Sequence, residues 1–179
     1  ANAGLVEGMK GFFNPTSTIS RQFKTGMMGE GVLGYDEVNM SQSIVQHTTG
    51  SRSTSDTILV NGAVTTQGAS TISLDGGTGS ATIKVGDVFT IAGVYAVNPQ
   101  TRQTTGSLQQ FVVTSTATAS SGAWTNVGIS PAIYTSSQAL ATVDSFPADN
   151  AAVTFLGAAS TSYPQNLIYN KNAITLGTA

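Results

Sequence analysis

The sequence predicts a mainly β protein, built around an antiparallel β-barrel or sandwich, for three reasons. Short runs rich in Val, Ile, Thr and aromatic residues recur at intervals of about 8 to 12 residues. Gly, Asn, Asp and Pro separate these runs, as they do in turns. Residues 85–99 and 100–114 form two β-rich stretches around a polar turn, which is typical of adjacent antiparallel strands.

One short helix is expected before the strands, at residues 14–26. Asn14 can cap its start, and Pro15 suits the first helical position. Ile19 and Phe23 lie four residues apart, so they share one face of a helix.

The following part of the chain, residues 51–161, has the sequence pattern of a single β domain. Its expected strands are residues 57–60, 70–74, 81–85, 88–91, 111–114, 124–130 and 151–156. Residues 1–50 are expected to form a separate segment that contains the helix. Residues 162–179 are predicted to be an extended strand that returns to that first segment.

Composition narrows the classes of function. Only 9% of the residues are charged, against about 25% in ordinary domains, and the net charge is −2. Such a surface lacks the clustered Lys and Arg that bind a phosphate backbone, so direct nucleic-acid binding is not expected. The sequence has no cysteine and no apolar run near the roughly 20 residues that span a bilayer. We therefore expect no disulfide, no thiolate metal site and no membrane segment.

No constellation of residues predicts an enzyme, a metal site or a cofactor. His47 is the only histidine, and we expect it to be a polar residue at a strand end. The glycine-rich residues 74–80 lack the Lys-Ser/Thr pair of a phosphate loop, so a hairpin turn is expected there. Asp144 and Asp149 are interpreted as turn residues rather than as cation ligands.

Stretches in three successive parts of the chain resemble the major capsid (coat) proteins of short-tailed double-stranded-DNA bacteriophages. The central stretch, residues 85–114, resembles the β-barrel domain that is inserted into the capsid fold of these proteins. Residues 11–15 (GFFNP) and 34–38 (GYDEV) are similar to coat-body segments before the insertion. Residues 162–176 (SYPQNLIYNKNAITL) are similar to the strand that returns to the body.

The resemblance implies a structural protein, here a fragment of a longer coat protein centred on the insertion domain. Its partners would be other copies of the coat protein, together with scaffolding and portal proteins. It would reside in the virion capsid, after assembly in the cytoplasm of a bacterial host. In this family the inserted domain stabilises the coat monomer, and one of its loops reaches a neighbouring capsomer.

Two loops are candidates for that contact, residues 98–107 and the region between Val60 and Ser73. In the first, Gln100, Arg102 and Gln103 are the candidate inter-subunit residues, because an exposed arginine can make bidentate contacts to a neighbour's carboxylate or carbonyls.

A glycan-binding β-sandwich from a tail fibre or adhesin is the alternative. The low charge of this chain and its aromatic residues Tyr95, Trp124 and Tyr134 would suit that function. A glycan platform needs an exposed indole, whereas a barrel core needs Trp124 buried with its N–H paired.

Overall fold

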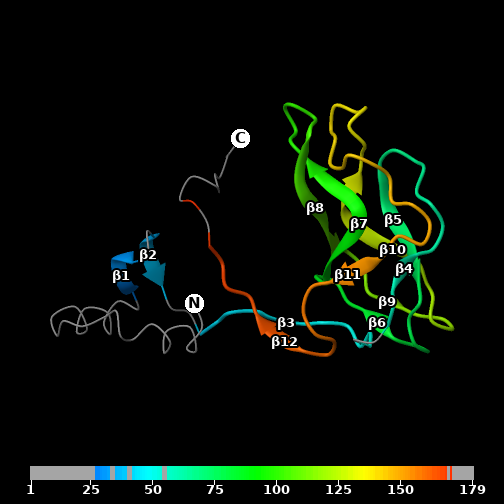
Figure 1. Cartoon of the computed structure of the whole chain (residues 1–179). Helices are drawn as coiled ribbons and strands as arrows, with labels where there is room; N and C mark the ends of the chain where they lie inside the picture. Colours follow the sequence, from blue (N-terminus) through cyan, green and yellow to red (C-terminus); the bar gives the residue numbers. More distant parts are fainter. Residues whose placement is uncertain (1–26, 33–34, 40–41, 54–55, 169, 171–179) are drawn as a thin grey trace, which may run out of the picture. The chain divides into compact units, whose positions relative to one another are not determined.

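The computed structural model describes residues 27–32, 35–39, 42–53, 56–168 and 170, and these residues form twelve strands (Figure 1). Contacts divide the chain into two units. One unit comprises Ala1–His47 with Tyr163–Ala179, and the other comprises Thr48–Ser162. The mainly β prediction is confirmed, while the expected helix at residues 14–26 lies outside the described residues. No described helix is long and apolar enough to cross a bilayer.

In the first unit, strands β1 (Met27–Val32) and β2 (Tyr35–Asn39) form an antiparallel two-stranded sheet. A second small sheet pairs β3 (Gln46–Thr48) with β12 (Ser162–Pro164). Of the extended strand expected over residues 162–179, Ser162–Pro164 form a strand and residues 165–168 have no regular secondary structure, while residues 169 and 171–179 lie outside the described residues.

The second unit is built on a six-stranded sheet, whose strands follow the order β11-β7-β8-β10-β5-β4. All the pairings in this sheet are antiparallel. The strands are β4 (Leu59–Val60), β5 (Ala69–Asp75), β7 (Val88–Val97), β8 (Thr104–Val113), β10 (Trp124–Ile133) and β11 (Val153–Phe155). A small sheet of β6 (Thr82–Ile83) and β9 (Ala117–Thr118) lies in the same unit.

The two ends of the six-stranded sheet meet, so the sheet curls into a nearly closed barrel. Leu59 bridges Ala152, and the Val60 N–H donates to the Ala151 carbonyl at 3.0 Å. The Val153 N–H donates to the Ile58 carbonyl at 2.9 Å. Closure satisfies the backbone groups of both edge strands over this stretch, which removes the exposed edges of an open sheet.

Alternation along the strands fills the barrel with apolar side chains. In β7, Phe89 and Ile91 are buried, and in β8 Phe111 and Val113 are buried, because alternate residues of a strand face the same side. The Phe89 ring lies 5.7 Å from that of Phe111 and 5.2 Å from that of Phe155, measured between centroids. Such aromatic pairs add to the stability gained by burial alone.

Two expectations about connections were wrong. Residues 74–80 do not form a hairpin turn, because β5 pairs with β4 and β10, whereas the next strand, β6, pairs with β9. This loop instead crosses between the two sheets, and the Gly77 N–H donates to the Gly122 carbonyl at 2.9 Å. The polar turn expected over residues 98–107 is also shorter than predicted, since β8 begins at Thr104.

Candidate subunit-contact site

The hairpin between β7 and β8 carries the first candidate loop, and its tip is a compact turn over residues 98–103. The Asn98 N–H donates to the Gln103 carbonyl at 2.9 Å, and the Arg102 N–H donates to the Asn98 carbonyl at 2.7 Å. The Asn98 side-chain oxygen also accepts from the N–H groups of Gln100 at 2.9 Å and Thr101 at 3.3 Å. This is the Asx-turn that asparagine makes with the backbone that follows it. Asn98 therefore holds the turn through both its backbone and its side chain.

The three predicted contact residues come together on this turn. Gln100, Arg102 and Gln103 are all exposed. Arg102 has a φ of 56°, a left-handed backbone conformation that is uncommon for residues other than glycine, and its N–H bond to Asn98 helps to hold it there. Sequence reasoning missed Asn98, although an asparagine before a proline is itself a turn signal.

The second candidate loop, between β4 and β5, is fastened to the rest of the barrel. The Gly62 N–H donates to the Asp149 carboxylate at 2.9 Å. The Gln67 side chain bonds Thr135 twice, donating to its hydroxyl at 2.6 Å and accepting from its N–H at 3.0 Å. Asp149 and Thr135 therefore hold this loop against the rest of the barrel.

Both candidate loops lie at the same end of the barrel. Because β8 and β10 are antiparallel, with Ile129 opposite Val113, the start of β8 and the end of β10 lie at the same end of the barrel. Ile133 at that end of β10 pairs with Ala69 at the start of β5, directly after the second loop. Figure 1 shows the β7–β8 tip and the segment after β10 at the upper end of the barrel. This end is where a neighbouring molecule can meet both loops.

The segment that leads into the barrel is hydrogen-bonded to the segment that leads out of it. The Thr49 N–H donates to the Thr161 carbonyl, and the Thr161 N–H donates to the Thr49 hydroxyl oxygen, both at 3.1 Å. The Thr49 hydroxyl donates to the Ala158 carbonyl at 2.6 Å, and the Ser160 N–H donates to the Gly50 carbonyl at 2.9 Å. Residues more than a hundred positions apart in sequence thus join the two ends of the barrel domain.

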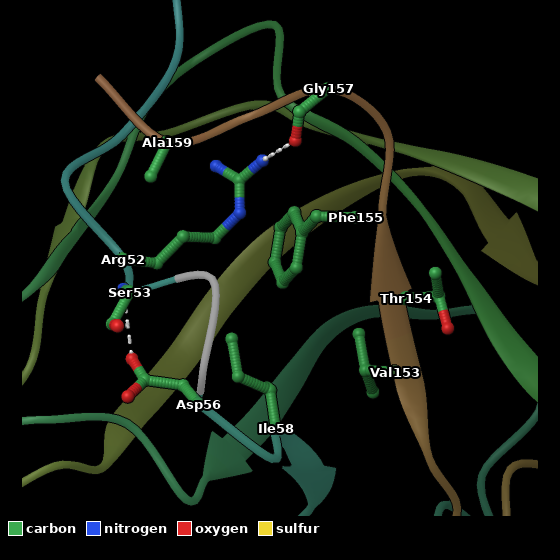
Figure 2. Close-up of a pocket in the computed structure, with 9 residues that line it drawn as sticks. All are labelled: Arg52, Ser53, Asp56, Ile58, Val153, Thr154, Phe155, Gly157 and Ala159. Carbon is green, nitrogen blue, oxygen red and sulfur yellow. Dashed lines mark hydrogen bonds between the residues drawn. The ribbon is translucent and has the colours of Figure 1, made fainter. Parts of the chain in front are cut away.

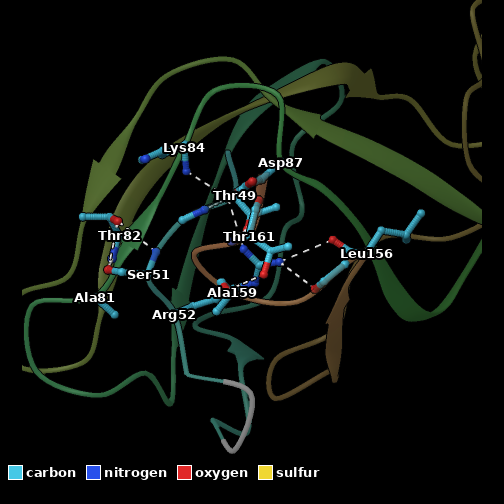
Figure 3. Close-up of polar contacts among 12 residues, drawn as sticks. Thr49, Ser51, Arg52, Ala81, Thr82, Lys84, Asp87, Leu156, Ala159 and Thr161 are labelled. Carbon is cyan, nitrogen blue, oxygen red and sulfur yellow. Dashed lines mark hydrogen bonds and ion pairs between the residues drawn. The ribbon is translucent and has the colours of Figure 1, made fainter. Parts of the chain in front are cut away.

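A buried ion pair lies at this junction (Figure 3). One Arg52 guanidinium nitrogen lies 3.2 Å from the Asp87 carboxylate, and the two residues are only 4% and 1% exposed. The same carboxylate oxygen accepts from the N–H groups of Gly50 at 3.1 Å and Lys84 at 2.9 Å. Arg52 also donates to the Gly157 carbonyl at 3.2 Å. Both charges are therefore compensated, as burial in a low-dielectric interior requires.

An open cleft of ≈ 290 Å³ lies beside this ion pair (Figure 2). The Arg52 guanidinium carbon sits 4.3 Å from the centre of the Phe155 ring, a cation–π contact. Asp56 lines the same cleft and accepts from the Thr78 hydroxyl at 2.6 Å and the Ser53 N–H at 3.0 Å. The hydrogen bond from Thr78 is the main cause that lowers the pKa of Asp56.

Among the described residues that line the cleft, the charged ones are Arg52 and Asp56. Across the described part of the chain, no three His, Cys, Asp or Glu side chains cluster to hold a metal ion. His47 lies within β3, and the carboxylate of Asp144 accepts from the Tyr95 N–H at 2.8 Å, as a turn residue does. Arg52 is already committed to the ion pair and to backbone carbonyls. The cleft is best described as part of the junction.

Trp124 bears on the glycan alternative. Its side chain is fully buried, and its indole N–H donates to the Ala81 carbonyl at 3.0 Å. This is the arrangement expected for a barrel core, and it removes the one tryptophan from any sugar-binding platform.

Two of three comparisons with known proteins found a match. A family model described as P22 coat protein, gene protein 5, matches residues 14–179. A solved structure titled CUS-3 coat protein I-domain is 30% identical, and the match covers 58% of this chain and 98% of that chain, with a TM-score of 0.41. No curated protein sequence matches the chain.

Proposed function

Because the chain belongs to the P22 coat protein family, it is a structural part of a bacteriophage capsid, and we propose that its barrel is an insertion domain that stabilises the coat subunit. The proposed boundaries are residues 1–50 for a coat-body segment, 51–161 for the barrel and 162–179 for the return to the body. The bonds between Thr49 and Thr161 carry this proposal. They bring the two ends of the barrel together, which is the geometry that lets one domain be inserted into another.

The barrel end that carries the two loops is proposed to contact neighbouring subunits in an icosahedral shell. The tip residues Gln100, Arg102 and Gln103 are exposed, and hydrogen bonds to Asn98 already order their backbone, so little loop entropy is lost on contact. Each such contact is weak by itself. Many copies arranged with the same symmetry make it strong.

Other copies of the coat protein are the partners that family membership provides. Scaffolding and portal proteins are proposed as further partners, and assembly is proposed to occur in the cytoplasm of the bacterial host. Direct nucleic-acid binding by this segment is not proposed, because the chain has a net charge of −2 and only seven Lys and Arg residues.

Electron microscopy of the coat protein that carries this sequence tests the proposal. The protein is expressed with and without the gene upstream, the expected location of a scaffolding gene. Regular hollow shells are the expected result. Soluble trimers or fibres without shells under both conditions would contradict the capsid function and favour the adhesin alternative.

The contact role of the tip is tested with Arg102→Ala. We expect the variant subunit to be as stable as the unchanged one, because Arg102 is exposed, but to give fewer or irregular shells. Lys84→Ala serves as a control that removes one cation away from the tip. Normal shells from Arg102→Ala would contradict the contact role.

A further inference from the structure

Strand β8 has a backbone edge that the barrel does not use. Strand β7 pairs with it from Val88 opposite Val112 to Val97 opposite Thr104. On its other side, β10 pairs only with Val112 and Val113. Within the described part of the chain, no strand pairs with the segment from Thr104 to Phe111 on that side. Barrel closure therefore leaves this stretch of β8 open.

The direction of the backbone groups follows from the bonds at the end of β8. The Val113 N–H donates to the Asp87 carbonyl, and the Val113 carbonyl accepts from the Gly86 N–H, both at 2.9 Å. The backbone N–H and C=O groups of Val113 therefore face the β7 side of the strand. Alternate residues of a strand face the same side. Leu108 and Gln110 therefore direct their N–H and C=O groups away from β7, toward the open edge.

The side chain of Gln109 covers part of this edge. Its amide nitrogen donates to the Gln110 carbonyl at 2.8 Å. The N–H of another strand can easily replace a side-chain donor at an edge carbonyl, because the two hydrogen bonds are both neutral and of similar strength.

The edge carries no charged residue and no proline that would block pairing. Natural proteins blunt open edges with Lys, Pro or bulges, because an unpaired edge is a template for another strand. Residues 104–110 read Thr-Thr-Gly-Ser-Leu-Gln-Gln, without a charge or a proline. A bulge does occur between Leu108 and Thr104, where Gly106 has a φ of 78°. The register also shifts between Thr90 opposite Gln110 and Tyr95 opposite Leu108, but the extra residues there belong to β7 and not to β8.

We propose that the open edges of β8 from two copies of this chain pair as antiparallel strands about a two-fold axis. In the register that uses both outward-facing residues, Leu108 lies opposite Gln110 of the second copy, and Gln109 lies opposite its own counterpart. This inference rests on the proposed function, since the shell supplies the second copy. It is a β-strand addition, in which backbone hydrogen bonds supply the affinity.

Three properties of the edge favour a second copy as its occupant. An antiparallel pair is self-complementary about a two-fold axis, so one surface serves both partners. The stretch carries no charge, so two copies do not repel each other. The outer face beside it exposes Tyr95, Leu108 and Val112 at 37%, 38% and 39%, and pairing would bring two such apolar strips together.

Cysteine cross-linking in assembled shells tests the register, because the sequence contains no cysteine. Opposed residues of a non-hydrogen-bonded pair lie about 4.5 Å apart between Cα atoms, within reach of a disulfide. Gln109→Cys is therefore expected to give a covalent dimer on mild oxidation. Gln103→Cys is the control on the same hairpin. Six residues from the axis, it would lie about 40 Å from its counterpart and give no dimer.

A backbone variant tests the hydrogen bonds themselves. Gln110→Pro removes an N–H that faces away from β7, and proline is tolerated on an edge strand. In the Gln109→Cys background, Gln110→Pro is expected to abolish the dimer, while Gln110→Ala is expected to retain it. A dimer that persists with Gln110→Pro would show that the strands do not pair through this edge.

The remaining outcomes separate this inference from the proposed function. Normal shells without a Gln109→Cys dimer overturn the pairing and leave the capsid function intact. A dimer from Gln103→Cys instead of Gln109→Cys places the contact at the hairpin tip and also overturns the pairing. Failure of the unchanged protein to form shells overturns the proposed function, and the pairing with it.

Discussion

The guanidinium of Arg52 and the carboxylate of Asp87 meet at 3.2 Å inside the barrel, although the residues are 35 positions apart. Asp87 belongs to the turn just before β7, while Arg52 follows the point where the chain enters the domain. Because Arg52 also bonds the Gly157 carbonyl, one side chain links the entrance of the domain, its sheet and its exit. This relationship makes the junction sensitive to single substitutions.

Asp87→Ala is expected to destabilise the barrel by about 3–5 kcal/mol, because it leaves the buried Arg52 charge uncompensated. It also removes the acceptor for the N–H groups of Gly50 and Lys84. Urea unfolding followed by tryptophan fluorescence measures the loss.

A pair of arginine variants provides the control for this prediction. Arg52→Met should be strongly destabilising, whereas Arg102→Met, at an exposed position, should change the free energy of unfolding by about 0.5 kcal/mol or less. Equal effects of the two substitutions would contradict the role assigned to the buried pair.

The strands of the barrel could be predicted because their signal is local. Short runs rich in Val, Ile, Thr and aromatic residues, such as 88–91, favour a strand, and the structure has strands or parts of strands at each predicted position. The boundaries were less predictable. Apart from Leu108, the residues from Thr104 to Gln110 are polar or glycine and nearly all are exposed, so their hydropathy does not distinguish strand from turn. Their pairing with β7 makes them a strand.

The junction and the open edge could not be predicted, because they depend on contacts between distant residues. Arg52 and Asp87 look like ordinary surface charges in sequence, and only the fold brings them together. The open edge of β8 depends on where β10 turns away, after Ser130 opposite Val112. The tip was partly predictable, since Asn98 before Pro99 is a local turn signal.

Trp124 fluorescence is predicted to be blue-shifted and resistant to a polar quencher such as iodide in the folded protein. The side chain is fully buried and its N–H is paired with the Ala81 carbonyl, so water and quencher are excluded. Unfolding in urea should move the emission to the red and restore quenching. A red-shifted, readily quenched emission from the folded protein would contradict the core position and support a glycan platform.

Asp56 is predicted to contribute stability that is lost in acid. Its pKa is lower in the folded chain, chiefly because of the hydrogen bond from Thr78, so the folded state favours the charged form. The contribution is complete above the pKa of the unfolded chain, about 3.9, and disappears as the pH falls through the lower folded value. Unfolding measured across this acid range should show the decline.

Thr78→Val separates this effect from other acid-sensitive groups. It removes the hydroxyl donor while nearly preserving side-chain volume, so the pKa of Asp56 should rise toward its ordinary value and part of the acid dependence should vanish. Titration of the Asp56 carboxyl by NMR measures the shift. Thr101→Val, at an exposed position in the hairpin tip, is the control and should leave that pKa unchanged.

Asn98→Ala is predicted to loosen the hairpin tip without unfolding the barrel. The substitution removes the oxygen that accepts from the N–H groups of Gln100 and Thr101, but it leaves both backbone bonds between Asn98 and residues 102 and 103. Amide hydrogen exchange should become faster at residues 100 and 101, while the thermal midpoint stays nearly constant because the tip is exposed. Asn98→Asp keeps an acceptor in the same place and should retain slow exchange. If ordering of the tip matters for subunit contact, shells should form less efficiently with Asn98→Ala than with Asn98→Asp, and equal yields would show that the contact does not depend on this turn.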